Sequence, residues 1–318
     1  MRATKRRAPP WADRLDLERI RDPRERRVVA LSVLANAMVI ALAAAVIYFA
    51  PVWLSAHGHV SALVNRIRLA AIASVFLLPV LAVFRLGRWA SYLENSVRLG
   101  RDQLPEIFLI LERHCRTLGV DPPRLYVSTL ESAEVSTALA LARGRRIIVL
   151  GPALFNGLDR IAERADVLGF VLASELGRLA LGHASWWEDL VLGYLKRIPI
   201  LRAPLLKVQT SSRDRFAATL SPASIRGLAL AAVGGDLLSH VDLDAFVRQV
   251  VHDPTSPWWA WVGELGRDGP SLARRLRDLQ SAGFLDLEER GAAPGAEGTS
   301  AGHAPTEGAD GRHPPTLQ

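Results

Sequence analysis

The sequence predicts an α+β fold that is mostly helical with a small sheet and is preceded by a hairpin of two transmembrane helices. Three observations predict this fold class. Two apolar runs occupy residues 28–50 and 69–84. Short apolar runs typical of strands lie within residues 124–150. After them, apolar side chains recur mainly at helical spacing, as expected for a domain built from packed helices.

The first apolar run predicts a transmembrane helix that stays in the mature protein. Residues 28–50 are 23 consecutive uncharged positions. A hydrocarbon core needs about 20 helical residues, and the apolar part of a cleaved signal sequence has about 7 to 15. The run at residues 69–84 is shorter and contains Pro79, but arginines flank it on both sides. It predicts a second span, with a re-entrant or interfacial helix as the alternative.

The charge distribution predicts the orientation of this hairpin. Ten Lys and Arg residues lie within residues 1–27, and none lies within residues 51–65. The positive-inside rule therefore places the N-terminus and the main domain of this integral membrane protein in the cytoplasm. The net charge is +7, and the basic residues cluster beside the spans, so we expect a lipid bilayer and no nucleic acid as partner. The single cysteine, Cys115, excludes an intrachain disulfide.

These patterns divide the chain into four segments. Residues 1–27 form a basic cytoplasmic N-terminus, and residues 28–86 form the two transmembrane helices with a short outer loop. Residues 87–290 form the cytoplasmic domain. Residues 291–318 are rich in Gly, Ala, Pro, Ser and Thr and cannot bury a core, so this tail is expected to be disordered.

Periodicity and turn residues predict the first elements of the domain. Residues 86–119 predict a helix or a pair of helices, residues 124–130 a strand, and residues 135–150 a β-hairpin. A helix is expected to begin at Pro152 and run through Leu158.

The second half of the domain is predicted to be helical. The next helix begins at Arg160 or Asp166. Residues 186–208 are apolar but are interrupted by charges and prolines, so they are too broken to span a bilayer. Further helices are predicted at residues 212–220, 224–238 and 271–280.

One predicted helix carries the most informative pattern of the chain. Residues 171–183 read VLASELGRLALGH. In a zinc protease helix, two histidines four residues apart bind the metal, and the glutamate that follows the first acts as general base. Glu175 keeps the place of this glutamate, but Ser174 and Arg178 stand where the histidines would be.

The order of the motifs resembles the HtpX-like and CAAX-prenyl-protease-like family of membrane zinc metallopeptidases, which are gluzincins. The likeness covers residues 104–283 and the membrane segments. It is carried by the basic N-terminus, the apolar hairpin and, in this order, the segments RRIIVLGPALFNGL, SELGRLALGH, DRFAATL and GPSLARRLRDL. The resemblance implies a zincin-like domain and metalloendopeptidase activity on membrane or misfolded proteins.

The resemblance also implies that all three zinc ligands are replaced. Ser174 and Arg178 take the places of two histidines. The third ligand of the family is a glutamate four residues before an Asp-Arg element. Asp214 matches that Asp, and the ligand position is then Thr210. Glu175 keeps the general-base position, so the resemblance is that of a degenerate member of the family.

The chemistry of these residues argues against zinc. Hydroxyls are poor substitutes for imidazole or carboxylate, and a guanidinium stays protonated and has no lone pair to offer. His183, which matches the distal Gly-His of the family, follows Arg178 by five residues and lies about 140° round the helix from it. The spacing of His240 and His252 gives no support for a relocated site. We therefore expect no cofactor, with zinc only if unconventional ligands sustain an active enzyme.

The guanidinium in this position is expected to form an ion pair. Arg178 is predicted to pair with Glu175, three residues earlier, or with Asp214, in a buried or half-buried arrangement, with an exposed pair as the alternative. The Arg-rich helix at residues 271–280 is expected to close the domain with one arginine turned inward, or to bind lipid or an acidic partner.

Together these residues predict a membrane-anchored pseudopeptidase. Its remaining function would be to hold a peptide along the edge strand of the β-hairpin or to regulate an active relative or another membrane protein. The alternative is an active zinc metalloendopeptidase that uses Glu175 with unconventional ligands, and a third hypothesis is a structural membrane scaffold. Tryptophans within residues 186–187 and 258–261 are expected at the membrane interface or in the core.

Overall fold

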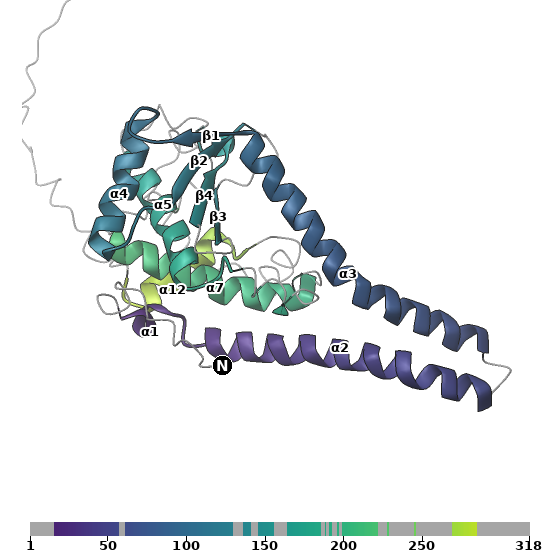
Figure 1. Cartoon of the computed structure of the whole chain (residues 1–318). Coiled ribbons are helices and arrows are strands. Elements are labelled where there is room, and N and C mark those ends of the chain that lie inside the picture. The colour runs from purple at the N-terminus through teal and green to yellow at the C-terminus, as the bar shows by residue number, and fades with distance from the viewer. Residues whose placement is uncertain are drawn as a thin grey trace, which may run out of the picture. The chain divides into compact units, whose positions relative to one another are not determined.

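The computed structural model describes the chain between residues 16 and 284, with gaps. The described residues are 16–56, 61–129, 136–140, 146–155, 164–185, 188, 191–192, 196, 199–221, 228, 245 and 269–284. They form mostly helices and one small mixed sheet (Figure 1). In chain order the elements are α1 (Leu17–Ile20), α2 (Glu25–Ala56), α3 (Ser61–Glu94), β1 (Ser96–Leu99), α4 (Pro105–Leu118), β2 (Arg124–Ser128), β3 (Ser136–Ala140), β4 (Arg146–Leu150), the 3₁₀ helix η3 (Pro152–Leu154), α5 (Arg164–Ala180), α7 (Pro199–Leu220) and α12 (Leu272–Ser281).

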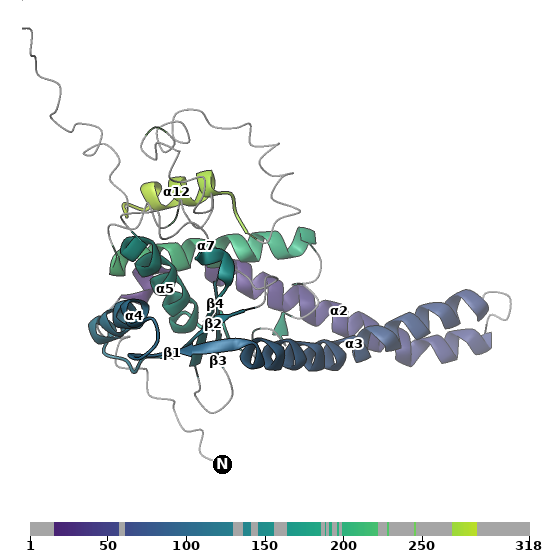
Figure 2. The same cartoon turned by 90° about the horizontal axis from the view of Figure 1, so that it is seen from above.

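The two longest helices, α2 and α3, contact each other near the C-terminal end of α2 and the N-terminal end of α3 (Figures 1 and 2). The segment Glu25–Trp53 of α2 is long and apolar enough to cross a membrane. The first predicted span is therefore a single helix of sufficient length. In α3 the second apolar run is also helical, and Pro79 lies inside the helix without ending it. That α3 crosses the membrane stays a prediction.

The sheet has four strands in the order β1-β2-β4-β3. The pairs β1–β2 and β3–β4 are antiparallel, and β2–β4 is parallel. The predicted β-hairpin is confirmed, because β3 pairs with β4 from Ser136 opposite Leu150 to Ala140 opposite Arg146. Among the described strands, β3 has a neighbour on one side only, and it is therefore an edge strand.

Helix α5 lies at the centre of the domain. Its residues Val167 to Gly177 are all buried, and it packs against α7, α4 and β3. The approach to α7 is closest at Gly177, where an added Cβ would lie 2.9 Å from Cδ1 of Phe216. Glycine is needed here because any side chain would push the two helices apart.

The structure differs from the sequence prediction at β1 and at α7. The predicted helix or helix pair over residues 86–119 is interrupted by β1, which pairs with β2 and buries Leu99. A four-residue run has too little local pattern to reveal this strand, and sheet pairing decides its structure. Helix α7 begins at Pro199 and continues through Pro204, where a break was predicted. Near the N-terminus of a helix, a proline removes few backbone hydrogen bonds, and packing on α2 and α5 supports the helix there.

The other predicted boundaries agree with the structure within a few residues. Helix α5 begins at Arg164, between the two predicted starts. The helix predicted from Pro152 is a 3₁₀ turn over Pro152–Leu154, and Leu158 lies outside the described residues. Also outside them are the tail, His240, His252, the tryptophans within residues 186–187 and 258–261, and all of the predicted helix at residues 224–238 except Leu228, which is helical and buried.

Candidate functional site

The middle of α5 carries the retained glutamate against the edge strand β3. Glu175 is 3% exposed. The hydroxyl of Ser136, the first residue of β3, donates to Glu175 Oε1 at 2.9 Å. The other carboxylate oxygen, Oε2, is buried and has no hydrogen-bond partner within the described structure. Because an ionised carboxylate only accepts hydrogen bonds, Glu175 has room for one more donor.

Arg178 forms the ion pair with Glu175 that its position suggests. Its Nη1 lies 3.9 Å from Glu175 Oε2, which is too far for a hydrogen bond. The same nitrogen donates to the hydroxyl of Thr137 at 3.3 Å. The Arg178 side chain is 29% exposed, so the pair is half-buried and part of the guanidinium reaches the surface.

Asp214 does not pair with Arg178, so that alternative was wrong. The Asp214 carboxylate is buried and accepts two hydrogen bonds from Arg275 of α12, from Nε at 2.7 Å and from Nη2 at 2.6 Å. This planar, two-point contact suits a guanidinium and a carboxylate. Arg275 is therefore the inward-turned arginine that was expected in the closing helix. Its positive charge neutralises the carboxylate of Asp214.

Arg213 is a second cation near Glu175 that the sequence reading missed. It stands three residues before Phe216 in α7, on the helical face that meets Gly177. Its Nη2 donates weakly to the hydroxyl of Thr210 at 3.4 Å, and its Nε is buried without a partner. Burial first and the nearby Arg178 charge second lower the pKa of Arg213, whereas Glu175 and Asp214 act in the opposite direction. The guanidinium nevertheless stays charged. No spacing within the sequence marks Arg213, because it reaches the site through the packing of α7 on α5.

The residues at the three family ligand positions do not fit zinc. Ser174 and Thr210 are buried hydroxyls, and Arg178 is a cation. Within the described part of the chain, no group of three or more His, Cys, Asp or Glu side chains could hold a metal ion. Arg178 and Arg213 bring two positive charges to Glu175, and these would repel a metal ion.

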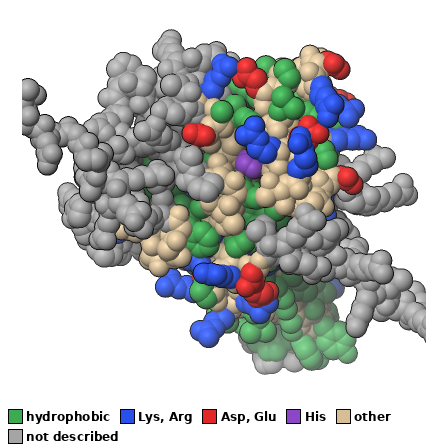
Figure 3. All heavy atoms as spheres, turned by 90° about the vertical axis from the view of Figure 1, so that its left-hand side faces the viewer, with side chains coloured by type: hydrophobic (Ala, Val, Ile, Leu, Met, Phe, Trp, Pro, Cys, Tyr) green, Lys and Arg blue, Asp and Glu red, His purple; other side chains and the backbone are tan. Residues whose placement is uncertain are grey.

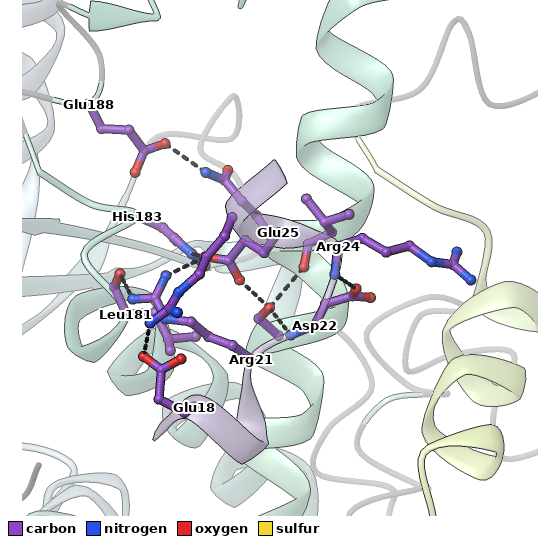
Figure 4. A network of polar contacts seen from close by, with 12 residues as sticks. Glu18, Arg21, Asp22, Arg24, Glu25, Leu181, His183 and Glu188 are labelled. Carbon is purple, nitrogen blue, oxygen red and sulfur yellow. Dashed lines mark hydrogen bonds and ion pairs between the residues drawn. The ribbon is translucent and has the colours of Figure 1, made fainter. Parts of the chain in front are cut away.

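His183 lies in a different cluster, at the start of α2. Its Nε2 is 2.8 Å from Oε1 of Glu25, the first residue of α2, which is 1% exposed. Arg21 Nη1 donates to the same oxygen at 2.6 Å, and the Ser212 hydroxyl of α7 donates to Glu25 Oε2. Figure 4 shows the side chains of Arg21 and His183 pointing toward Glu25, with Arg21 just before α2 and His183 just after α5. Glu25 and its three partners form the α2 junction.

Backbone contacts strengthen the α2 junction. The Asp22 N–H donates to the Ser212 hydroxyl at 2.9 Å, and Arg21 Nη2 donates to the Leu181 carbonyl at 2.8 Å. His183 thus ties α2 to the domain and does not reach Glu175. Glu25 could not be singled out from the sequence, because it is one of five acidic residues among the basic ones within residues 1–27. Its position as the last acid before the apolar run was the signal.

The remaining candidates from α4 have structural roles. Nε2 of buried His114 lies 3.1 Å from the carbonyl oxygen of Gly169 in α5, which joins the two helices. Burial raises the pKa of the Cys115 thiol to about 12. Since the thiolate is the nucleophilic form, Cys115 is inert near neutral pH.

Comparisons of the chain with models of protein families, with curated proteins and with solved structures find no match. The resemblance to the HtpX-like family therefore rests on the order of the motifs alone.

Proposed function

We propose that this chain is a membrane-anchored, degenerate relative of the HtpX-like metallopeptidases that binds an extended peptide beside Glu175 without cleaving it. One observation carries the proposal. Two guanidiniums, from Arg178 and Arg213, lie near the glutamate beside which a metallopeptidase would need a metal ion. Neither can act as a ligand, since a guanidinium has no lone pair.

The edge strand β3 supports binding of a peptide. An edge strand offers unpaired backbone groups, and a peptide can add to it as a further strand. Ser136 and Thr137 fix β3 to α5 through Glu175 and Arg178. A peptide on β3 would therefore lie directly beside the charged side chains of α5.

Membrane anchoring is supported by α2 and by the charges at its start. Arg24, Arg26 and Arg27 are exposed at the beginning of the apolar helix. Figure 3 shows one face of the molecule, and at its lower edge Lys and Arg side chains lie beside a dense group of hydrophobic side chains. Arginines at this boundary suit anionic lipid headgroups. We propose that the N-terminus and the domain lie in the cytoplasm, and protease protection of tags at both ends in sealed vesicles tests this orientation.

The decisive experiment measures zinc and proteolysis in the purified full-length protein. We expect no stoichiometric zinc and no cleavage of unfolded protein substrates, with retention of peptides in a binding assay. Stoichiometric zinc, together with cleavage that is lost in the Glu175→Gln variant, would overturn the proposal in favour of an active enzyme. The absence of any bound peptide would instead favour a structural scaffold.

A triple variant tests whether residues 174, 178 and 210 occupy the zinc-ligand positions of the family. Ser174→His, Arg178→His and Thr210→Glu together restore the ligand set that the resemblance implies. We expect this variant to bind zinc, whereas the same variant carrying Glu175→Gln should bind zinc without hydrolysing peptides. Failure of the folded triple variant to bind zinc would show that these positions are not the family's ligand positions.

A further inference from the structure

We propose that the Glu175 site recognises the free C-terminal carboxylate of a peptide paired antiparallel with β3. This inference rests on the proposed function, because it specifies which end of the bound peptide the site takes. It is argued from the local charge, from the hydrogen-bonding groups left without partners and from the direction of β3.

The charges of the site favour a ligand that carries one negative charge. Asp214 and Arg275 neutralise each other through two hydrogen bonds. Arg178 Nη1 lies 3.9 Å from Glu175 Oε2, and Arg213 interacts electrostatically with both residues. Among the described side chains, two positive charges are then opposed by Glu175, so the described part of this half-buried site carries one positive charge in excess. Separation of like charges from bulk water is unfavourable unless an opposite charge is near. A ligand with a single negative charge balances the site.

The buried hydrogen-bonding groups of the site indicate that the ligand also carries a hydrogen-bond donor close to its negative charge. Among the described residues, the buried Glu175 Oε2 has no donor and the buried Arg213 Nε has no acceptor. Within the same part of the chain, Arg178 donates to the hydroxyl of Thr137, and a guanidinium has further N–H groups to offer. The ligand must therefore accept from guanidiniums and donate to a carboxylate within a few ångströms.

A C-terminal residue has this combination. Its carboxylate suits the forked donors of Arg178 and Arg213, and its backbone N–H, attached to the same Cα, can donate to Glu175 Oε2. A peptide group in the middle of a chain has the donor but no charge. Inorganic anions such as sulfate have the charge but no donor, so they leave Glu175 unsatisfied.

The direction of β3 places the C-terminus of an antiparallel peptide beside the first residues of β3. Strand β3 runs from Ser136 to Ala140, and its first two residues contact Glu175 and Arg178. A strand that pairs antiparallel with β3 reaches the first residue of β3 with its own C-terminal end. The last residue of such a peptide therefore arrives beside the guanidiniums.

The test compares two forms of one probe on the unaltered full-length protein in detergent or lipid nanodiscs. The probe is a mixed-sequence peptide pool, acetylated and fluorescently labelled at the N-terminus, prepared as free acids and as C-terminal amides. We expect the acids to bind at least about tenfold more tightly than the amides, which corresponds to about 1.4 kcal/mol. Acids and amides that bind equally would overturn the carboxylate recognition and leave the proposed function standing. If neither form binds, both proposals fail.

Two variants locate the binding. Arg213→Gln and Arg178→Gln should each reduce the preference for acids over amides several-fold. Arg113→Gln, which removes an exposed arginine of α4, is the matched control and should leave the preference unchanged. An unchanged preference in both folded site variants would place the recognition elsewhere and overturn the assignment. Where a site variant does not fold, the comparison of acids with amides on the unaltered protein still decides.

Discussion

At the Glu175 site, the two arginines differ in their surroundings. Arg178 is part-exposed and bonds to β3, whereas Arg213 belongs to α7 and is held by Thr210. The described positive charges near Glu175 belong to side chains from two helices, α5 and α7. Replacement of one side chain therefore changes both the charge balance and the packing between α5 and α7.

Replacement of Arg178 with Ala is expected to destabilise the domain by about 1 kcal/mol, because it removes the ion pair with the buried Glu175 and the hydrogen bond to Thr137. Solvent screening of the pair and the loss of repulsion between Arg178 and Arg213 keep the effect small. The measurement is the thermal unfolding midpoint of the solubilised protein. Arg116→Ala is the control, because its ion pair with Glu112 involves an arginine that is 73% exposed. A midpoint that stays at the parent value would show that Arg213 alone balances Glu175.

His114 predicts a pH dependence of stability. Burial is the main cause that lowers its pKa, and the nearby Arg113 lowers it further, against the carbonyl of Gly169, which raises it. Below its usual pKa of about 6.5, the unfolded chain binds a proton at His114 that the folded chain does not. The free energy of unfolding therefore falls as the pH decreases from about 6.5 toward the lowered value.

The variant His114→Gln should flatten this dependence. Glutamine is neutral throughout and can still donate to the Gly169 carbonyl. The unfolding midpoint of the parent should drop more between pH values of about 7 and 5 than that of the variant. Parallel curves would mean that His114 does not titrate on unfolding.

At the scale of elements, the contact between α5 and α7 depends on Gly177. Its replacement with Ala places a Cβ 2.9 Å from Cδ1 of Phe216, at a distance that real Cβ atoms do not occupy. We expect a loss of about 1 to 3 kcal/mol in stability, and the additional change Phe216→Leu should restore part of it. Gly87→Ala in α3 is the control, since nothing lies within 4 Å of its added Cβ. Equal stability of Gly177→Ala and the control would contradict the close packing.

The helices and strands that could be predicted from the sequence were those with a long apolar pattern or with clear turn residues at their ends. The hairpin β3–β4 and the helices α2 and α5 could be predicted because apolar spacing and turn residues agree along their length. Strand β1 could not, because its structure depends on pairing with β2. The same holds for the site. Glu175 and its ion pair with Arg178 follow from spacing within one helix, whereas Arg213 enters only through the packing of α7 on α5.

At the scale of the whole chain, the α2 junction connects α2, which is long and apolar enough to cross a membrane, to the helices that carry the site. Glu25 belongs to the first turn of α2, His183 follows α5, and Ser212 belongs to α7. Helix α2 contacts α7, and α7 contacts α5, so α2 packs in one continuous set with the helices around Glu175. His183 therefore serves to attach α2 to the domain.

A double-mutant cycle measures this attachment. His183→Ala leaves the buried Glu25 with Arg21 and Ser212 only, and Glu25→Gln removes the charge that His183 meets. Each change should destabilise the protein, His183→Ala by about 2 to 3 kcal/mol, because a buried carboxylate that loses a partner is costly. In the double variant the losses should be smaller than their sum by about 1 kcal/mol or more. Additive losses in thermal unfolding would mean that the two residues stabilise the protein independently and that α2 is held by packing alone.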